Sequence, residues 1–495
     1  MNRTKPQHME PNTARIVAIS LSMLLPGCML GPDYQAPSPE LPNAWRQAGH
    51  SAPAAAAADD PRWWQTFDDP VLSRLIVMAQ TGNRDLKQAA ARVEEAKARR
   101  ELAFANLLPT SSLTTSVNQT GSAKAAGISA GSTGIGRTFE HYSHTLSASW
   151  ELDLFGKLRR SLEAAEATEQ AAQEDLYAVL VSLYAEVAQT YIELRGYQER
   201  LTITETNLAT QTDTYEITQW RQMAGLSTQL DVEQAKVTLE NTRASLPSLR
   251  SSLQQAKHNL AKLTGQAPDA LYQLLARPAP IPVANRDIAL GIPADLLRQR
   301  PDVRQAERKL AAQTAQIGVA EAANYPDFTL SGSIGLDSLA FANLYTASAK
   351  AFQMAAKSAL VLLDGGRIRA NVAIQSALQQ QALGFYEQTL LTALSEVENG
   401  LIAYREESQR QDALKVAVEA GDNALAIAKL QYQAGTSDFQ AVLETQRALL
   451  NNQLQLAQSR ADLASYLVQV YKALGGGWQT RITPPTGEQE DHERS

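Results

Sequence analysis

The stretch RDLKQAAARVEEAKARRELAFANLLP, from Arg84 to Pro109, returns later in the chain as PDVRQAERKLAAQTAQIGVAEAANYP, from Pro301 to Pro326. The two copies lie 217 positions apart, and matching residues include Asp85 and Asp302, Gln88 and Gln305, Ala89 and Ala306, and Pro109 and Pro326. Further on, Gly156 matches Gly366 and the pair Ala224-Gly225 matches Ala434-Gly435, both 210 positions apart. The chain therefore contains one structural unit twice, with a single connection that is 7 residues longer in the first copy.

The composition is that of a folded protein with sizeable cores. Hydrophobic residues make up 44% of the 495 residues, which excludes general disorder. The charges are nearly balanced, with 45 basic and 52 acidic residues and a net charge of −7, and no long run of like charge occurs. This balance makes nucleic acid an improbable partner.

The N-terminus has the pattern of a secretory signal peptide. Basic residues precede an apolar run from Ile16 to Leu25, which is too short to span a bilayer as a mature helix. The run ends at Leu25-Pro26-Gly27-Cys28, and Cys28 is the only cysteine, so no internal disulfide can form. The segment resembles a bacterial lipobox, which implies covalent lipid on Cys28; a buried free thiol near an ordinary cleavage site is the alternative. Met29 follows the cysteine in place of the aspartate that signals inner-membrane retention, which favours the outer membrane.

The rest of the chain is predicted to divide in four. Residues 28–69 hold many prolines and an alanine run, so we expect a lipidated, extended tether. Residues 70–280 and 281–475 are the two structural repeats, and 476–495 form a flexible tail, while 1–27 are the signal peptide.

Each repeat contains a long helix followed by a returning one. No proline occurs between Gly156 and Gly225, and apolar residues recur there in a seven-residue pattern typical of a coiled coil. The matching stretch from Gly366 to Gly435 has the same spacings, and each helix would be about 100 Å long at about 1.5 Å per residue. Antiparallel helices are expected from Ser227 to Thr264 and from Ser437 to Leu474, just after the glycine turns.

Two stretches in each repeat alternate between apolar and polar residues, which predicts strands with one apolar face. Their apolar positions are Leu113 and Val117; Leu146, Trp150 and Leu152; Phe328, Leu330, Ile334 and Leu336; and Phe352, Met354, Leu360 and Leu362. A length of about ten residues suits tilted membrane strands. Four strands cannot close a barrel, and an open edge in lipid leaves unpaired backbone groups, so several chains must share one barrel. Three chains would give twelve strands, although the sequence requires only an oligomer.

The pattern resembles the TolC-type outer-membrane efflux channels, and in particular their NodT-like lipoprotein branch. The resemblance rests on the segment after Cys28, on Trp63-Trp64, on DLFGKLR and DGGRIR, and on the turns AGLSTQLDVEQA and AGTSDFQAVLETQR. It implies a mixed α and β fold: a trimeric, twelve-stranded outer-membrane barrel continued by a periplasmic α-helical coiled-coil barrel. It also implies a passive duct that exports small molecules or drugs, docked to a periplasmic adaptor (membrane fusion) protein and an inner-membrane pump, commonly of the resistance-nodulation-division (RND) class.

The resemblance further assigns residues to the closed periplasmic end. The polar gate positions carried over are Tyr432, Asp438, Gln440, Glu444, Asp231 and Gln234. Glu444 stands where the family often has an acidic ring, which would attract cations; a solvated charge on a helix face is the alternative. The turns Ala224-Gly225-Leu226 and Ala434-Gly435-Thr436 correspond to the adaptor-contacting tips, and their glycines would also end the helices.

No catalytic or metal site is predicted. The six histidines form no helix-spaced zinc motif, and the glycines near Gly131 lack the lysine and hydroxyl residue of a phosphate loop. We therefore expect a non-enzyme with no cofactor except the lipid on Cys28. The competing interpretation is a periplasmic structural or adaptor coiled-coil lipoprotein without a pore, which does not explain the four alternating strands.

Overall fold

The computed structural model describes residues 29–38, 62–121, 138–283 and 297–478. The predicted signal peptide, Cys28, most of the tether and the loop after the first strand lie outside the described residues. The chain divides into two compact units, and each is considered by itself below. The elements are η1 (Trp63–Phe67), α2 (Pro70–Gly82), α3 (Arg84–Ala105), β1 (Thr110–Gly121), β2 (Thr138–Leu152), α4 (Lys157–Met223), α5 (Gln229–Leu263), α7 (Pro301–Ala322), β3 (Asp327–Ser338), η2 (Phe341–Asn343), η3 (Ala347–Ala349), β4 (Lys350–Ala359), α8 (Arg367–Gln433) and α9 (Phe439–Ala473).

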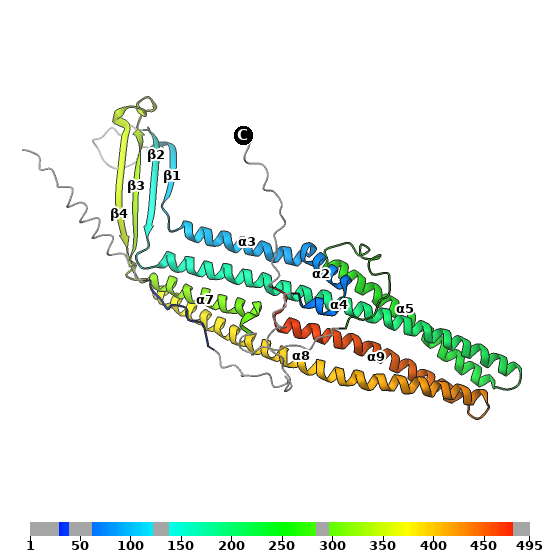
Figure 1. Cartoon of the computed structure of the whole chain (residues 1–495). Helices are drawn as coiled ribbons and strands as arrows, with labels where there is room; N and C mark the ends of the chain where they lie inside the picture. The colour runs from blue at the N-terminus through cyan, green and yellow to red at the C-terminus, as the bar shows by residue number, and fades with distance from the viewer. Residues whose placement is uncertain (1–28, 39–61, 122–137, 284–296, 479–495) are drawn as a thin grey trace, which may run out of the picture. The chain divides into compact units, whose positions relative to one another are not determined.

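The first unit is built on a four-stranded antiparallel sheet in the order β1-β2-β3-β4 (Figure 1). The strands are 12, 15, 12 and 10 residues long, so three exceed the ten residues expected. The alternation predicted to reach Leu362 stops earlier, because β4 and its pairing end at Ala359. Ends of the adjoining helices and residues up to Pro37 complete this unit.

The second unit contains the two helical hairpins, α4 with α5 and α8 with α9. The duplication is visible in their lengths, because α4 and α8 each have 67 residues and α5 and α9 each have 35. The order helix, strand, strand, long helix, turn, helix is the one predicted, and it occurs twice. The predicted apolar seam of α4 is buried at Leu180, Leu183 and Val187.

The duplication extends to the way the helices are capped. Asn83, just before α3, donates from its side-chain amide to the carbonyl of Leu263 at the end of α5, at 2.9 Å. Arg300, just before α7, donates in the same way to the carbonyl of Ala473 at the end of α9, at 2.6 Å. In the first copy a side chain thus joins the start of α3 to the end of α5, and in the second copy one joins the start of α7 to the end of α9. Each bond satisfies a carbonyl at the end of a helix.

A continuous core lies where η1 and α2 pack on α4 and α9. Trp63 stacks on Tyr471 with ring centroids 5.3 Å apart, and Trp64 meets Tyr184 edge-on at 4.8 Å. Tyr191 donates to Asp69, and burial followed by this hydrogen bond raises the pKa of Tyr191. The tryptophan pair thus packs against α9 and α4.

Two predicted boundaries need correction. The tether was expected to extend to residue 69, but Trp63, Trp64 and Phe67 form a buried 3₁₀ turn because their rings fill the core. The C-terminal tail was expected to begin at residue 476, but Trp478 packs on Tyr177 at 5.1 Å. The remaining boundaries, including 70–280 and 281–475, stay predictions.

None of the helices in the described part of the chain is long and apolar enough to cross a membrane.

Candidate functional site

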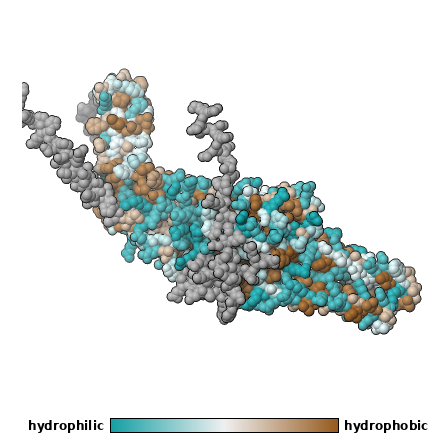
Figure 2. Space-filling view, viewed as in Figure 1, coloured by the Kyte–Doolittle hydropathy of each residue, from teal (hydrophilic) through white to brown (hydrophobic). Residues whose placement is uncertain are grey.

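The sheet has one apolar and one polar face. Backbone register aligns Leu113 with Leu146, Leu146 with Ile334, and Ile334 with Phe352, so one apolar row crosses all four strands. These side chains are between 50% and 85% exposed. Proteins surrounded by water rarely expose a continuous apolar row of this kind. Figure 2 shows apolar side chains gathered over the strands among weakly polar ones.

The opposite face consists largely of small hydroxyl side chains. Ser112 pairs with Ser147, and Ser147 pairs with Ser333, all in the register that alternates with the apolar row. On the same face, Ser116 and Ser143 are hydrogen-bonded at 2.8 Å. An apolar outside and a polar, small-residue inside are what a water-filled barrel in lipid requires.

Aromatic side chains lie near both ends of the apolar face. Tyr142 meets Phe341 edge-on at 5.5 Å near one end, and Trp150 donates to the carbonyl of Leu107 at 2.9 Å near the other. Tyr142 and Trp150 are about 26 Å apart along β2 at about 3.3 Å per residue. Barrel strands tilt by about 40°, so this length spans about 20 Å of an apolar band that is about 25 Å tall. The two aromatic side chains therefore lie toward opposite ends of the band, which supports Trp150 as an interfacial anchor.

Among the described residues, both edges of the sheet are unpaired, since β1 pairs only with β2 and β4 only with β3. In lipid, each unpaired backbone group costs several kcal/mol. The edges must therefore pair with strands of other copies.

The two hairpin turns have the same backbone geometry. The amide of Leu226 donates to the carbonyl of Arg221 at 2.8 Å, and the amide of Thr436 donates to that of Gln431 at 2.9 Å. Gly225 and Gly435 both adopt φ of +74°, the left-handed conformation that ends a helix in a Schellman motif. All six residues predicted to contact an adaptor are exposed, namely Ala224, Gly225, Leu226, Ala434, Gly435 and Thr436.

Two predicted gate carboxylates cap helices. Asp231 completes a capping box with Thr228 at the start of α5, and Asp438 accepts a hydrogen bond from the amide of Ala441 at the start of α9. Partial burial by itself would raise the pKa of Asp231, but hydrogen bonds from Thr228 and Ser227 outweigh it and lower the pKa. These side chains therefore have a structural role whether or not they line a gate.

The other predicted gate residues differ in exposure. Glu444 is exposed and accepts a hydrogen bond from the amide of Gln440 at 2.9 Å. Gln234 is half-buried on the second turn of α5. Tyr432 is half-buried, and its ring lies 5.2 Å from that of Phe439.

Sequence reasoning missed Arg221. Its guanidinium carbon lies 4.6 Å from the centre of the Tyr432 ring, so a cation–π contact joins the end of α4 to the end of α8. Within the described part of the chain, neither Nε of Arg221 nor the hydroxyl of Tyr432 has a hydrogen-bond partner. No local pattern marks Arg221 in the sequence, because its partner ring lies in the other hairpin.

Toward the turns, the contact between α4 and α9 is polar. Asn207 donates to Gln453 at 2.8 Å, and Gln446 donates to Thr214 at 2.9 Å. Thr218 is fully buried there, and its hydroxyl donates to the carbonyl of Thr214 within its own helix. Such hydrogen bonds, exchangeable with water, contribute only about 0.5–1.5 kcal/mol each. Polar contacts thus supplement the small apolar cluster of Ala235, Ala428, Phe439, Val442 and Leu443 that joins the hairpins at this end.

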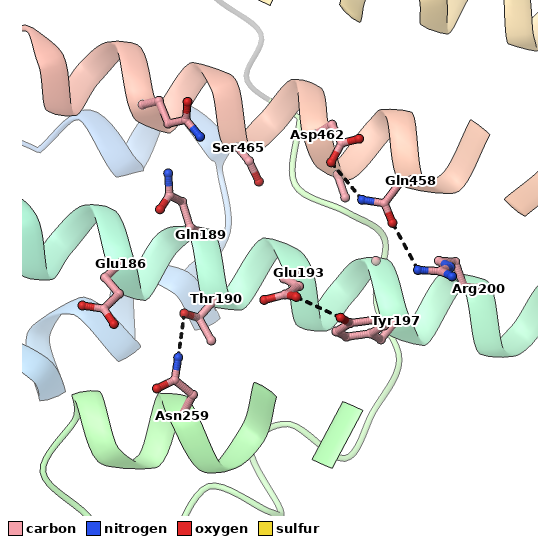
Figure 3. A pocket seen from close by; sticks show the side chains of 13 residues that line it. Glu186, Gln189, Thr190, Glu193, Tyr197, Arg200, Asn259, Gln458, Asp462 and Ser465 are labelled. Carbon is pink, nitrogen blue, oxygen red and sulfur yellow. Dashed lines mark hydrogen bonds between the residues drawn. The ribbon is translucent and has the colours of Figure 1, made fainter. Parts of the chain in front are cut away.

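A polar groove of about 390 Å³ lies farther along these helices (Figure 3). Glu193 accepts a hydrogen bond from Tyr197 on α4, and Gln458 links Arg200 to Asp462. The groove lies on the side of α4 opposite to Tyr184 and Tyr191, which the core covers. A face of charged and amide groups is suited to the wall of an aqueous duct.

The chain belongs to the family described as outer membrane efflux protein, whose model it matches over residues 75–266 and 292–476. It is 35% identical over 466 residues to Nodulation protein T of Rhizobium leguminosarum bv. viciae, with 94% of each chain covered. It is 31% identical over 465 residues to outer membrane protein OprJ of Pseudomonas aeruginosa, covering 94% of this chain and 96% of that protein. The solved outer-membrane channel OprN superposes with a TM-score of 0.85 at 36% identity, over 91% of this chain and all of that one.

The chain is thus an efflux channel subunit of the outer membrane that extends into the periplasm. The predicted resemblance and the mixed fold class are confirmed, and four strands per chain with long helices fit a twelve-stranded barrel shared by three chains. The pore-free coiled-coil alternative is wrong, because it leaves an apolar-faced sheet in a channel family unexplained. As a family of export channels, these proteins work with the other components of an efflux pump.

Proposed function

We propose that the chain is the outer-membrane duct of a tripartite pump, and that the two turns dock a periplasmic adaptor protein joined to an inner-membrane pump of the RND class. The observation that carries this proposal is the exposure of both turns together with the apolar side chains of Trp220, Met223 and Leu226, which are 62%, 73% and 67% exposed. An exposed apolar cluster on a helical end favours burial by another protein.

A photo-crosslinking residue at Leu226 is expected to capture the adaptor encoded with the pump in intact cells. The same residue at Val77, an exposed apolar position on α2 away from the turns, is the matched control. Bands are compared after purification of the channel and immunodetection of the adaptor. Equal capture from Val77, or none from Leu226, would contradict docking at the turns.

The gate proposal concerns the same turns. Tyr432, Asp438, Gln440, Glu444, Asp231 and Gln234 are proposed to line the closed mouth. Of these, Glu444 is the best ring residue, because its carboxylate is exposed and caps no helix. Three copies around one axis would attract cations and oppose tight closure by mutual repulsion.

Neutralising this ring is expected to lower cation preference. Glu444→Gln keeps the shape of the side chain and removes three charges per trimer, so the reversal potential in planar-bilayer recordings under a salt gradient should move toward zero. Glu419→Gln, at an exposed glutamate farther back on α8, is the control and should leave selectivity unchanged. Equal selectivity of both variants and the parent would remove Glu444 from the mouth.

The lipid is the remaining proposal: N-palmitoyl and S-diacylglycerol groups on Cys28. The lipobox-like sequence before Cys28 supports it. A Cys28→Ser variant should lose radiolabelled palmitate completely yet remain foldable, since the strands and hairpin cores lie far downstream. Equal labelling of variant and parent would show that Cys28 is not the acylated residue.

A further inference from the structure

The first described residues pack on the helices of the first unit. We call Met29–Tyr34 the N-terminal strap; it begins near the foot of the strands and runs beside α7 (Figure 1). The amide of Leu30 donates to the carbonyl of Phe155 at 3.4 Å, and the hydroxyl of Tyr34 donates to Glu307 at 3.0 Å. The strap is extended, as predicted for the tether after Cys28, but it packs on the helices.

Glycine permits an unusually close backbone crossing between the strap and α7. A Cβ on Gly31 would lie 2.4 Å from Cα of Gly318, and a Cβ on Gly318 would lie 2.6 Å from the carbonyl oxygen of Leu30. Gly31 also has φ of +86°, a backbone conformation that residues with a side chain rarely adopt. A second contact of this kind occurs at Gly156, where a Cβ would lie 2.8 Å from the side chain of Met29.

A buried arginine secures the crossing. Arg160 donates to the strap carbonyls of Leu30 at 2.9 Å and Gly31 at 3.2 Å, and to the carboxylate of Asp33 at 2.7 Å. Only 2% of its side chain is exposed, whereas 86% of the Asp33 side chain is exposed. Charge-assisted hydrogen bonds from a buried guanidinium are strong and directional, so the strap is held in one register.

The duplication supplies an internal comparison. At the repeat offsets, Arg160 corresponds to Ala370 and Gly318 corresponds to Glu101. Gly366, the counterpart of Gly156, has nothing within 4 Å of a built Cβ. Arg160 and Gly318 are therefore specific to one copy, whereas the glycine at 156 is shared by both copies and only its contact with Met29 is not.

We propose that Arg160, Gly318 and Gly156 form a seat for the mature N-terminus, and that this seat fixes the lipid of Cys28 at the foot of β2 and β3. The lipid role depends on the acylation proposed above; the seat itself depends only on the described contacts. Since Cys28 directly precedes Met29, the acyl chains of each copy would enter the membrane beside that copy's own strands.

The test is strap mobility in the full-length detergent-solubilised channel. A nitroxide on an Ala36→Cys background reports the strap, since Ala36 is exposed and a thioether-linked Cys28 does not react. Arg160→Met and, separately, Gly318→Ala should each raise the mobile fraction of the spectrum about tenfold, with palmitate labelling unchanged. Arg160→Met leaves Asp33 in solvent and Glu163, its other partner, 36% exposed, so neither carboxylate becomes a fully buried unpaired charge.

The controls match each change. Arg159→Met removes a neighbouring arginine that binds Asp153, and Gly384→Ala adds a methyl group to a helical glycine with open space around it. Both should keep the strap immobile. Equal mobility in all four variants and the parent would overturn the seat. If the Ala36→Cys parent takes up two nitroxides per chain, Cys28 is unmodified and the lipid role is overturned. The seat is then still judged from the mobility of the nitroxide at residue 36.

Discussion

Cross-linking Gln440→Cys between copies of the channel is expected to reduce export to the rate of cells that lack the chain. Gln440 is exposed on the first turn of α9, and it lies beside Glu444. If the mouth closes at these turns, its three copies approach one another at rest and must part for passage. A short bis-maleimide linker would hold them together whatever the pump does.

The control is a reversible linker of the same length. A disulfide-containing bis-maleimide should block export equally, and reduction should restore it within the same cells. The measurement is loss of a preloaded pump substrate, with the cross-linked trimer quantified on a denaturing gel. Normal export from a fully cross-linked population would place the constriction elsewhere along the duct.

Removing the contact between Arg221 and Tyr432 is expected to open the resting mouth. A partly desolvated cation–π contact contributes about 1–2 kcal/mol, so if it forms only while the mouth is closed, three copies would favour that state by about 3–6 kcal/mol. Because about 1.4 kcal/mol corresponds to a tenfold change, the open population should rise by about 100-fold or more in a trimer that opens as one unit. The contact lies between the two hairpins, at 4.6 Å, beside a small apolar cluster of Ala235, Ala428, Phe439, Val442 and Leu443 against which Tyr432 packs.

Arg221→Ala and Tyr432→Ala should each give this result in single-channel recordings, and the double variant should add little, since both remove one interaction. Arg243→Ala, at an exposed arginine that pairs only with Glu240 one turn away among the described contacts, should leave the conductance unchanged. Additive effects of the two single variants would argue against a direct contact. If neither single variant changes the conductance, the contact between Arg221 and Tyr432 does not hold the mouth closed.

Much of the fold follows from local pattern. The seven-residue repeat predicts α4 because a continuous apolar seam is stable only on a helix, and alternation predicts the strands because side chains of a strand point to opposite faces. The duplication made the second copy predictable from the first, down to turns that end on Gly225 and Gly435. The ends of elements were less accurate: Leu360 and Leu362 continue the alternation, but no backbone partner extends β4 to them.

The candidate site was predicted only in part. Glu444 and Gln440 were named from the resemblance, and their exposure near the second turn agrees with a mouth residue, though their role stays a prediction. Arg221 was not named, because a lone arginine on a long helix has no local signature. Only packing brings its guanidinium over a ring more than two hundred residues away.

The sequence by itself determined the repeat, the elements and the need for more than one chain, because each depends on periodicity or on the cost of unpaired backbone in lipid. Tertiary structure decided the contacts between distant segments: Trp63 on Tyr471, Arg221 on Tyr432, and the N-terminal strap on Gly318. Tether composition predicted an extended chain after Cys28 with no packed core. One buried arginine and a crossing of two glycines instead hold it, since hydrogen bonds and steric fit act between neighbours in space whatever their separation in sequence.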